Sequence, residues 1–140
     1  MKLETCPWYN CLAWAFAQVL GAQLPYRYRK YTLNPKSPIV EAFIQKAHEL
    51  EIEVKPLNTL EQLQNFQFGF LVYGYFLEEV QERNHKSYEY SGFHVVLWHK
   101  SNLIHQNGCG AMPAYTSVDK LHKMGYSDPK YFAVIPKEQE

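Results

Sequence analysis

The spacing of apolar residues predicts helices near the start of the chain. Residues 10–20 are almost continuously apolar and rich in alanine, which predicts a largely buried helix with Asn10 as its N-cap and Gly21 as its C-cap. Helical spacing returns after Ser37, a capping residue followed by proline at the first helical position, and continues to Leu50. A capping-box-like start at residues 58–61 predicts a brief third helix that ends near Asn65.

Most of the remaining elements have the spacing of β-strands. A short strand is predicted at residues 52–56, where Pro56 ends it, and a strand buried on both faces is predicted at residues 68–76. Residues 93–98 and 102–106 predict a β-hairpin closed by a tight turn at Lys100 and Ser101. The last expected elements are a short helix from about residue 117 to Met124, ended by Gly125, and a strand at residues 131–135, with loops at 21–36 and 78–90.

Helices followed by an antiparallel sheet define an α+β fold, with N-terminal helices packed on a C-terminal sheet. The chain has 140 residues, no internal repeat and no linker composition. This length is enough to bury a core without covalent staples, so we expect residues 1–140 to form a single domain.

Composition and charge exclude several classes of function. Fourteen basic and fourteen acidic residues cancel, so the basic surplus of a nucleic-acid binder is absent, although residues 26–31 form a short aromatic and basic run. No stretch approaches the roughly 20 apolar residues that span a bilayer, so we expect no membrane insertion. Residues 1–6 lack the apolar core of a signal peptide, so the expectation is a cytoplasmic protein, or one secreted by a route that is independent of a signal peptide.

Two residues carry the chemistry that the sequence points to. Cys11 follows the capping residue Asn10, and in the first helical turn the positive end of the helix dipole favours thiolate over thiol. His94 opens the predicted strand at residues 93–98. A cysteine that opens a helix and a histidine that opens a later strand are the two parts of a thiol hydrolase site, with the thiol as nucleophile and the imidazole as proton carrier.

Simpler interpretations exist for both residues. Cysteine on an alanine-rich helix also serves as a small buried apolar residue, and histidine on a strand also serves as a hydrogen-bonded core residue. A zinc site built from Cys6, Cys11, Cys109 and a histidine is conceivable, but the spacings lack the short-spaced ligand pairs of structural zinc modules. We therefore expect no metal and no cofactor, and the odd number of cysteines argues against a disulfide framework.

The hairpin predicts which residue orients His94. With a two-residue turn, cross-strand partners have numbers with an odd sum, so the face of the sheet that carries His94 also carries His105 and Asn107. A turn with an odd residue count would bring Gln106 to that face instead. His105 ranks first, Asn107 second and Gln106 third as the group that fixes the tautomer of His94. The backbone N–H of Cys11 is the expected oxyanion donor, and side chains of residues 8–10 are candidates for the second donor.

These motifs resemble a known superfamily. Asn10-Cys11 at the start of an alanine-rich helix, then Gly92-Phe93-His94-Val95-Val96-Leu97, then Ile104-His105-Gln106-Asn107, resemble the papain-like cysteine peptidases in their minimal bacterial form. Residues 40–96 are similar to the bacteriocin-processing peptidase domains of ABC exporters. The hairpin resembles the NlpC-type cell-wall peptidases, whose third residue is often histidine. The alanine-rich helix after Cys11 resembles that of papain-fold toxins proposed to deamidate glutamine.

The resemblance implies a papain-like fold and a cysteine-dependent amide hydrolase, in which Cys11, His94 and His105 or Asn107 form a triad and the reaction passes through a thioester. It implies a protein or peptide substrate and the role of a bacterial effector or toxin, with peptidase, amidase and glutamine deamidase all open. The chain departs from the exporter peptidases and the toxins by having His105 or Asn107 where they usually have aspartate. The alternatives are a catalytically inactive papain-like binding domain and an unrelated α+β interaction protein.

Overall fold

The computed structural model describes residues 10–28, 31–34, 36–74, 93–106 and 112–136. Within these residues the helices are α1 (Cys11–Leu20), α2 (Ile39–Glu49) and α4 (Val118–Lys123), with short 3-10 helices η1 (Tyr26–Tyr28) and η2 (Glu61–Asn65). The strands are β1 (Val54–Leu57), β2 (Phe68–Tyr73), β3 (His94–His99), β4 (Asn102–Gln106), β5 (Pro113–Thr116) and β6 (Lys130–Val134). They form one open antiparallel sheet of six strands in the order β1-β6-β2-β3-β4-β5, which makes the fold α+β as predicted.

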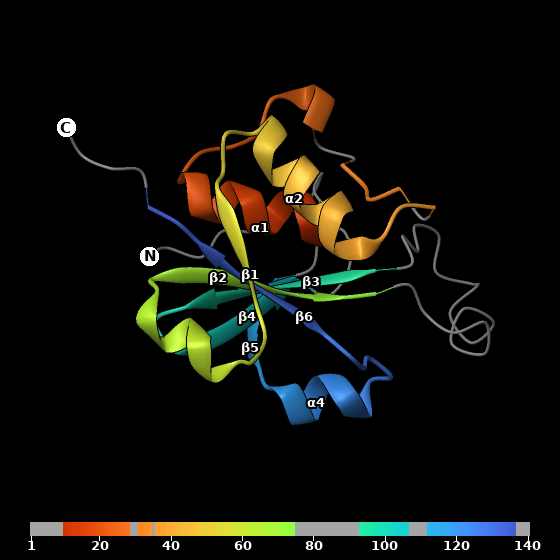
Figure 1. Ribbon diagram of the computed structural model, residues 1–140, viewed down its shortest axis with the longest axis vertical. Helices are drawn as coiled ribbons and strands as arrows, with labels where there is room; N and C mark the ends of the chain where they lie inside the picture. Colours follow the sequence, from red (N-terminus) through yellow and green to blue (C-terminus); the bar gives the residue numbers. More distant parts are fainter. Residues whose placement is uncertain (1–9, 29–30, 35, 75–92, 107–111, 137–140) are drawn as a thin grey trace.

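The sheet lies between two layers of helices. Helices α1 and α2 cover one face, and η2 and α4 lie on the other (Figure 1). Strand β3 shows how the sheet divides the core, because alternate residues of a strand point to opposite faces. Val95 and Leu97 belong to the cluster that contains α1, whereas Val96 and Trp98 belong to the cluster that contains Leu121 of α4.

Four phenylalanines join the helical layer to the sheet. Phe16 of α1, Phe43 of α2, Phe70 of β2 and Phe132 of β6 are all fully buried. Ring centroids lie 5.5 Å apart between Phe16 and Phe43, 5.2 Å between Phe43 and Phe70, and 4.4 Å between Phe43 and Phe132. Aromatic pairs at these separations add about 0.5–1.5 kcal/mol each beyond the burial of their apolar area. Both helices are thereby held over the centre of the sheet.

The hairpin between β3 and β4 forms as predicted. His99 pairs with Asn102, so Lys100 and Ser101 form a two-residue turn. Both turn residues have positive φ angles, 46° and 71°, as a type I′ turn requires. In this register the partner residues of β3 and β4 have numbers with an odd sum, so His94 and His105 share one face of the sheet.

Three predictions about local structure were wrong. Pro56 lies inside β1, opposite Phe132, and does not end the strand. Proline is tolerated there because β1 is an edge strand, and the missing N–H can face the outer edge, where no strand pairs with β1 in the described sheet. The third helix ends at Asn65 as predicted, but it is a 3-10 helix without the expected capping box. The N–H groups of Asn58 and Thr59 before it donate to the side chain of Gln62 instead. Helix α2 begins after Pro38 without a side-chain cap from Ser37. Strand β5, which pairs with β4, was not predicted at all.

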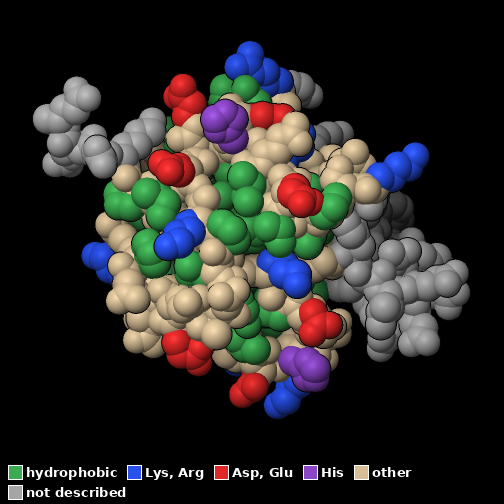
Figure 2. Space-filling view, viewed as in Figure 1, with side chains coloured by type: hydrophobic (Ala, Val, Ile, Leu, Met, Phe, Trp, Pro, Cys, Tyr) green, Lys and Arg blue, Asp and Glu red, His purple; other side chains and the backbone are tan. Residues whose placement is uncertain are grey.

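The surface view gives no sign of a large patch of one charge. Figure 2 shows Lys, Arg, Asp and Glu side chains scattered among apolar and neutral groups over the visible face. Across the described residues, no helix combines the length and the apolar character needed to cross a membrane.

Replacing Gly69 by alanine should destabilise the sheet. A Cβ atom at Gly69 would lie 2.3 Å from Leu63 Cδ2 and 2.7 Å from the carbonyl oxygen of Phe132, so Gly69→Ala should lower the free energy of unfolding by about 1–3 kcal/mol. Gly74→Ala is the matched control, because its Cβ would meet Ile39 Cδ1 at an ordinary 3.6 Å. Chemical denaturation measures both, and equal losses for the two variants would contradict the close approach of η2 to β2.

Candidate functional site

The start of α1 is held by one side chain. Asn10 is the N-cap, and its Oδ1 accepts a hydrogen bond from the N–H of Ala13 at 2.9 Å. Its Nδ2 donates to the carbonyl oxygen of Tyr31, which ties the helix start to the segment before α2. Cys11 is therefore in the first helical turn, as predicted. Because Nδ2 carries two hydrogens and the bond to Tyr31 uses one, Asn10 stays a candidate for the second oxyanion donor.

Cys11 lies at the beginning of β3. Cys11 is 7% exposed, and its Sγ donates to the carbonyl oxygen of Phe93 at 3.9 Å. The backbone N–H groups of Val95, Leu12 and Cys11 itself also lie near the sulfur. Phe93 and Val95 are the residues on either side of His94, so the sulfur lies beside the backbone of His94.

Burial determines the protonation of this thiol. Removal of the sulfur from water raises the pKa of Cys11 to about 11, and the backbone hydrogen bonds from Val95, Leu12 and Cys11 only partly offset this effect. The expectation that the helix start favours the thiolate was wrong in its net direction, because desolvation exceeds the effect of the helix N-terminus. At neutral pH the folded protein holds a neutral thiol.

His94 and His105 form a direct pair. Nε2 of His94 and Nδ1 of His105 are 2.9 Å apart, with the two ring planes at 81°. The side chains are 4% and 6% exposed. They share one face of the sheet, as the parity of the two-residue turn predicts. His105, which ranked first on sequence, is thus the residue that contacts His94.

Both imidazoles are neutral at physiological pH. Burial, followed by the proximity of His105, lowers the pKa of His94 to about 3. Burial also lowers the pKa of His105. A 2.9 Å contact between two neutral imidazoles needs one proton in it, so one ring donates and the other accepts.

The Cys11 sulfur and the His94 imidazole do not hydrogen-bond to each other, so the expected direct thiol–imidazole pair is not formed in this structure. The ring of His94 lies on the α4 side of the sheet, whereas Cys11 belongs to the core cluster on the α1 side and reaches the edge of β3. The hydrogen bond of the sulfur is with the carbonyl oxygen of Phe93 rather than with the imidazole. The structure thus joins Cys11 to the backbone around His94, and joins the His94 ring to His105.

The other candidates for the third position differ in placement. Gln106 is fully buried at the end of β4, but it follows His105 directly and so points to the opposite face of the strand. Asn107 lies outside the described residues, as do Cys6 and Cys109. Among the residues described, no three His, Cys, Asp or Glu side chains gather in a group that could hold a metal ion.

Sequence reasoning missed Tyr126. Its ring stacks on the His94 ring with centroids 4.5 Å apart and planes at 16°. Burial and, to a smaller extent, the neighbouring Cys11 raise the pKa of Tyr126 to about 12. The only signal in the sequence was Gly125 as a helix terminator, and nothing in the spacing connects residue 126 with residue 94.

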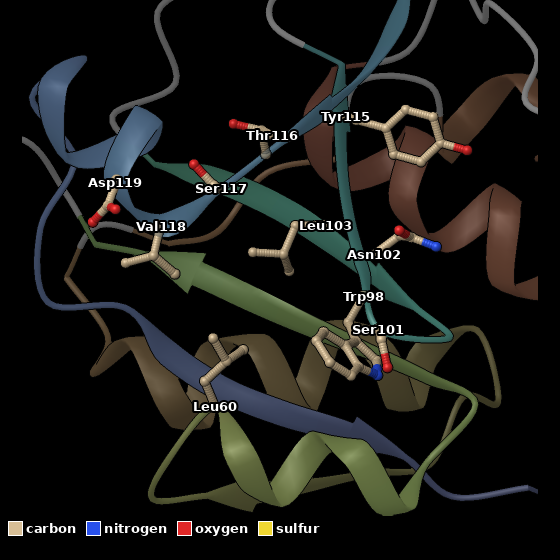
Figure 3. Close-up of a pocket in the computed structure, with 10 residues that line it drawn as sticks. All are labelled: Leu60, Trp98, Ser101, Asn102, Leu103, Tyr115, Thr116, Ser117, Val118 and Asp119. Atoms are coloured by element: carbon tan, nitrogen blue, oxygen red, sulfur yellow. The ribbon is translucent and has the colours of Figure 1, made fainter.

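A separate cavity of about 450 Å³ lies further along the same face of the sheet. In Figure 3 the side chains of Leu60, Leu103 and Val118 converge on it from η2, β4 and α4. The residue of β3 that lines the cavity is Trp98. Trp98 is four residues from His94 along the strand, which at about 3.3 Å per residue separates the two residues by roughly 13 Å. The cavity is therefore distinct from the Cys11 and His94 region.

Comparisons with models of protein families, with curated proteins and with solved structures find no match to this chain.

The cap at Asn10 should contribute to stability through two bonds. Asn10→Ala should lower the free energy of unfolding by about 1–2 kcal/mol, since it removes the cap oxygen and the bond to Tyr31. Asn10→Asp keeps an acceptor for the Ala13 N–H and should lose less. Ser117→Ala at the start of α4 removes a cap of the same kind without a second bond, and serves as the control. Equal losses for Asn10→Asp and Asn10→Ala in chemical denaturation would contradict the capping role.

The thiol should react slowly at neutral pH. With a pKa of about 11, the thiolate fraction of Cys11 at pH 7 is about one in ten thousand, so alkylation by iodoacetamide should accelerate about tenfold per pH unit without a neutral plateau. Peptide mapping by mass spectrometry separates Cys11 from Cys6 and Cys109, and the urea-unfolded protein is the control. A rate that is already constant between pH 6 and pH 8 would mean that the thiolate forms at neutral pH.

Proposed function

We propose that the protein is a papain-like cysteine-dependent amide hydrolase that uses Cys11, His94 and His105. The observation that carries the proposal is the 2.9 Å contact of His94 Nε2 with His105 Nδ1. The first-turn thiol of Cys11 hydrogen-bonds to the carbonyl oxygen of Phe93, the residue before His94. Papain-like enzymes share this order of parts: a cysteine that opens a helix, a histidine on a strand of an antiparallel sheet, and an orienting residue on the next strand. The chemical requirement is a nucleophile, a proton carrier and a group that fixes the carrier's tautomer.

The tautomer follows from these roles. If Nε2–H of His94 donates to Nδ1 of His105, the lone pair of His94 is on Nδ1. Nδ1 is then the atom that would take the thiol proton, which requires the sulfur to exchange its bond to Phe93 for one to the imidazole. The imidazolium that forms would be stabilised by the same bond to His105. Because the pKa of Cys11 is about 11 and that of His94 about 3, the resting pair is neutral, and proton transfer accompanies attack instead of preceding it.

The reaction then has two balanced steps. The sulfur of Cys11 bonds to the amide carbon, the C–N bond breaks, and His94 returns the proton to the leaving nitrogen, which leaves a thioester. Water then attacks the thioester, with His94 as its base, and releases a carboxylic acid and the free thiol. A peptide bond gives an amine as the leaving group, whereas a glutamine side chain gives ammonia. The backbone N–H of Cys11 is the proposed oxyanion donor.

A second function has a specific observation in its favour. Cys11 is 7% exposed and neutral, and both histidines are buried and neutral, which suits a core as well as a catalytic site. A papain-like domain that has lost catalysis and acts by binding would have the same packing. The two functions differ in whether Cys11 and His94 are needed for turnover.

Variants of the triad should separate these functions. With casein as the probe, peptide release and ammonia release should both be followed, and one of them should fall by about a thousandfold or more in Cys11→Ala and His94→Ala. His99→Ala, at the other end of β3, should keep turnover and is the matched control. His105→Ala should lower turnover by about 10²-fold, because His94 loses the partner that fixes its tautomer.

Folding has to be checked in parallel. Cys11→Ser changes the volume little and should alter the free energy of unfolding by about 1 kcal/mol or less. A stable Cys11→Ala variant with full turnover would show that the thiol is a packing residue. Turnover that survives in His105→Ala and is lost in Asn107→Ala would assign the third role to Asn107.

A further inference from the structure

Two residues fix the His94 ring from different directions. His105 meets its edge at Nε2, with the planes at 81°, and Tyr126 covers its flat face, with the planes at 16° and the centroids 4.5 Å apart. Tyr126 in turn contacts Tyr73, whose ring centroid is 5.6 Å away and whose Cα pairs with that of His94 across β2 and β3. The imidazole is enclosed by side chains from three parts of the chain.

Tyr126 is delivered by a defined backbone turn. Helix α4 ends at Lys123, Gly125 adopts a φ of 103°, and the N–H of Tyr126 donates to the carbonyl oxygen of Leu121 at 3.1 Å. Leu121 is itself fully buried in the cluster on this face of the sheet. This hydrogen bond holds the backbone of Tyr126 against the buried residue Leu121, which restricts where the Tyr126 ring can lie. The contact with His94 is therefore a feature of the fold, set by α4.

We propose that Tyr126 is a positioning residue for His94: its ring holds the imidazole plane so that Nε2 meets His105. Its catalytic meaning rests on the proposed function, whereas the positioning itself rests on the contacts alone. Stacked aromatic pairs at this distance attract each other, which favours one ring orientation over another. The same ring also covers one face of the imidazole and keeps water from it.

The groups around His94 make its pKa a measure of how far the Tyr126 ring shields it from water. His105 faces it from β4, Tyr73 from β2, Tyr126 from the turn after α4, and Cys11 lies beside its backbone from α1. All four are neutral at pH 7, so His94 has no counter-ion among them, and the main cause of its lowered pKa is burial. Removing the Tyr126 ring should admit water and raise that pKa towards its ordinary value.

The test is nitrogen NMR of the histidine rings in the full chain, followed against pH. Tyr126→Leu removes the stacked ring, and Tyr126→Phe keeps the ring without its hydroxyl. Tyr131→Leu is the control, because Tyr131 packs against the same apolar cluster from β6. Thermal melts establish that each variant is folded. His94→Ala, which removes one ring signal, assigns the resonances.

In the wild type, His94 should stay in one neutral tautomer across roughly pH 5–8. Tyr126→Leu should raise its pKa by about one to two units and mix the two tautomers, whereas Tyr126→Phe and Tyr131→Leu should leave both properties unchanged. Wild-type behaviour of His94 in a folded Tyr126→Leu variant would overturn the proposal. If Tyr126→Leu does not fold, a changed tautomer in Tyr126→Phe would overturn it, and an unchanged one would support it.

A second experiment tests whether the Tyr126 ring affects catalysis. Once turnover on casein is measured, Tyr126→Leu should lower kcat with little effect on KM and should shift the acid limb of the pH profile upward, and Tyr126→Phe should restore both. If the pKa and tautomer of His94 do not change in Tyr126→Leu, positioning by Tyr126 is contradicted, whatever the turnover of that variant. A clear NMR effect together with turnover that does not need His94 contradicts the proposed function and leaves the positioning intact.

Discussion

The packing of four phenylalanines at the centre of the sheet is the constraint on which the rest depends. Phe16, Phe43, Phe70 and Phe132 come from α1, α2, β2 and β6, and each is fully buried. Because protein interiors are close-packed, these rings leave α1 one position relative to the sheet. That position brings the first turn of α1 to the beginning of β3. The Cys11 sulfur consequently meets the backbone on both sides of His94.

The same tight packing sets the electrostatics of the site. A helix start and nearby backbone hydrogen bonds favour a thiolate, but Cys11 is only 7% exposed, and burial raises the pKa of its thiol to about 11. Burial also lowers the pKa of His94 to about 3. Desolvation disfavours the charged form of both groups, so it opposes the thiolate–imidazolium pair from both sides. For the proposed hydrolase, these pKa values mean that proton transfer would accompany attack by the sulfur instead of preceding it.

The His94 ring has contacts on its edge and on its flat face. His105 reaches it because the hairpin turn has two residues, and Tyr126 reaches it because α4 ends in a glycine turn. The first contact is local in sequence, and the second joins residues 32 positions apart. A histidine fixed by both contacts is prepared for directed proton transfer, which is what the proposed reaction needs.

The sequence by itself determined the local features: the Asn10 cap, the first-turn position of Cys11, the hairpin register and hence the shared face of His94 and His105. Each of these features depends on a few neighbouring residues, whose preferences for turns and helix caps can be recognised in the sequence alone. Only the tertiary structure decided that β6 lies between β1 and β2, that Tyr126 stacks on His94, and that burial outweighs the helix N-terminus at Cys11. These depend on which distant segments exclude water from one another, and no local spacing encodes that.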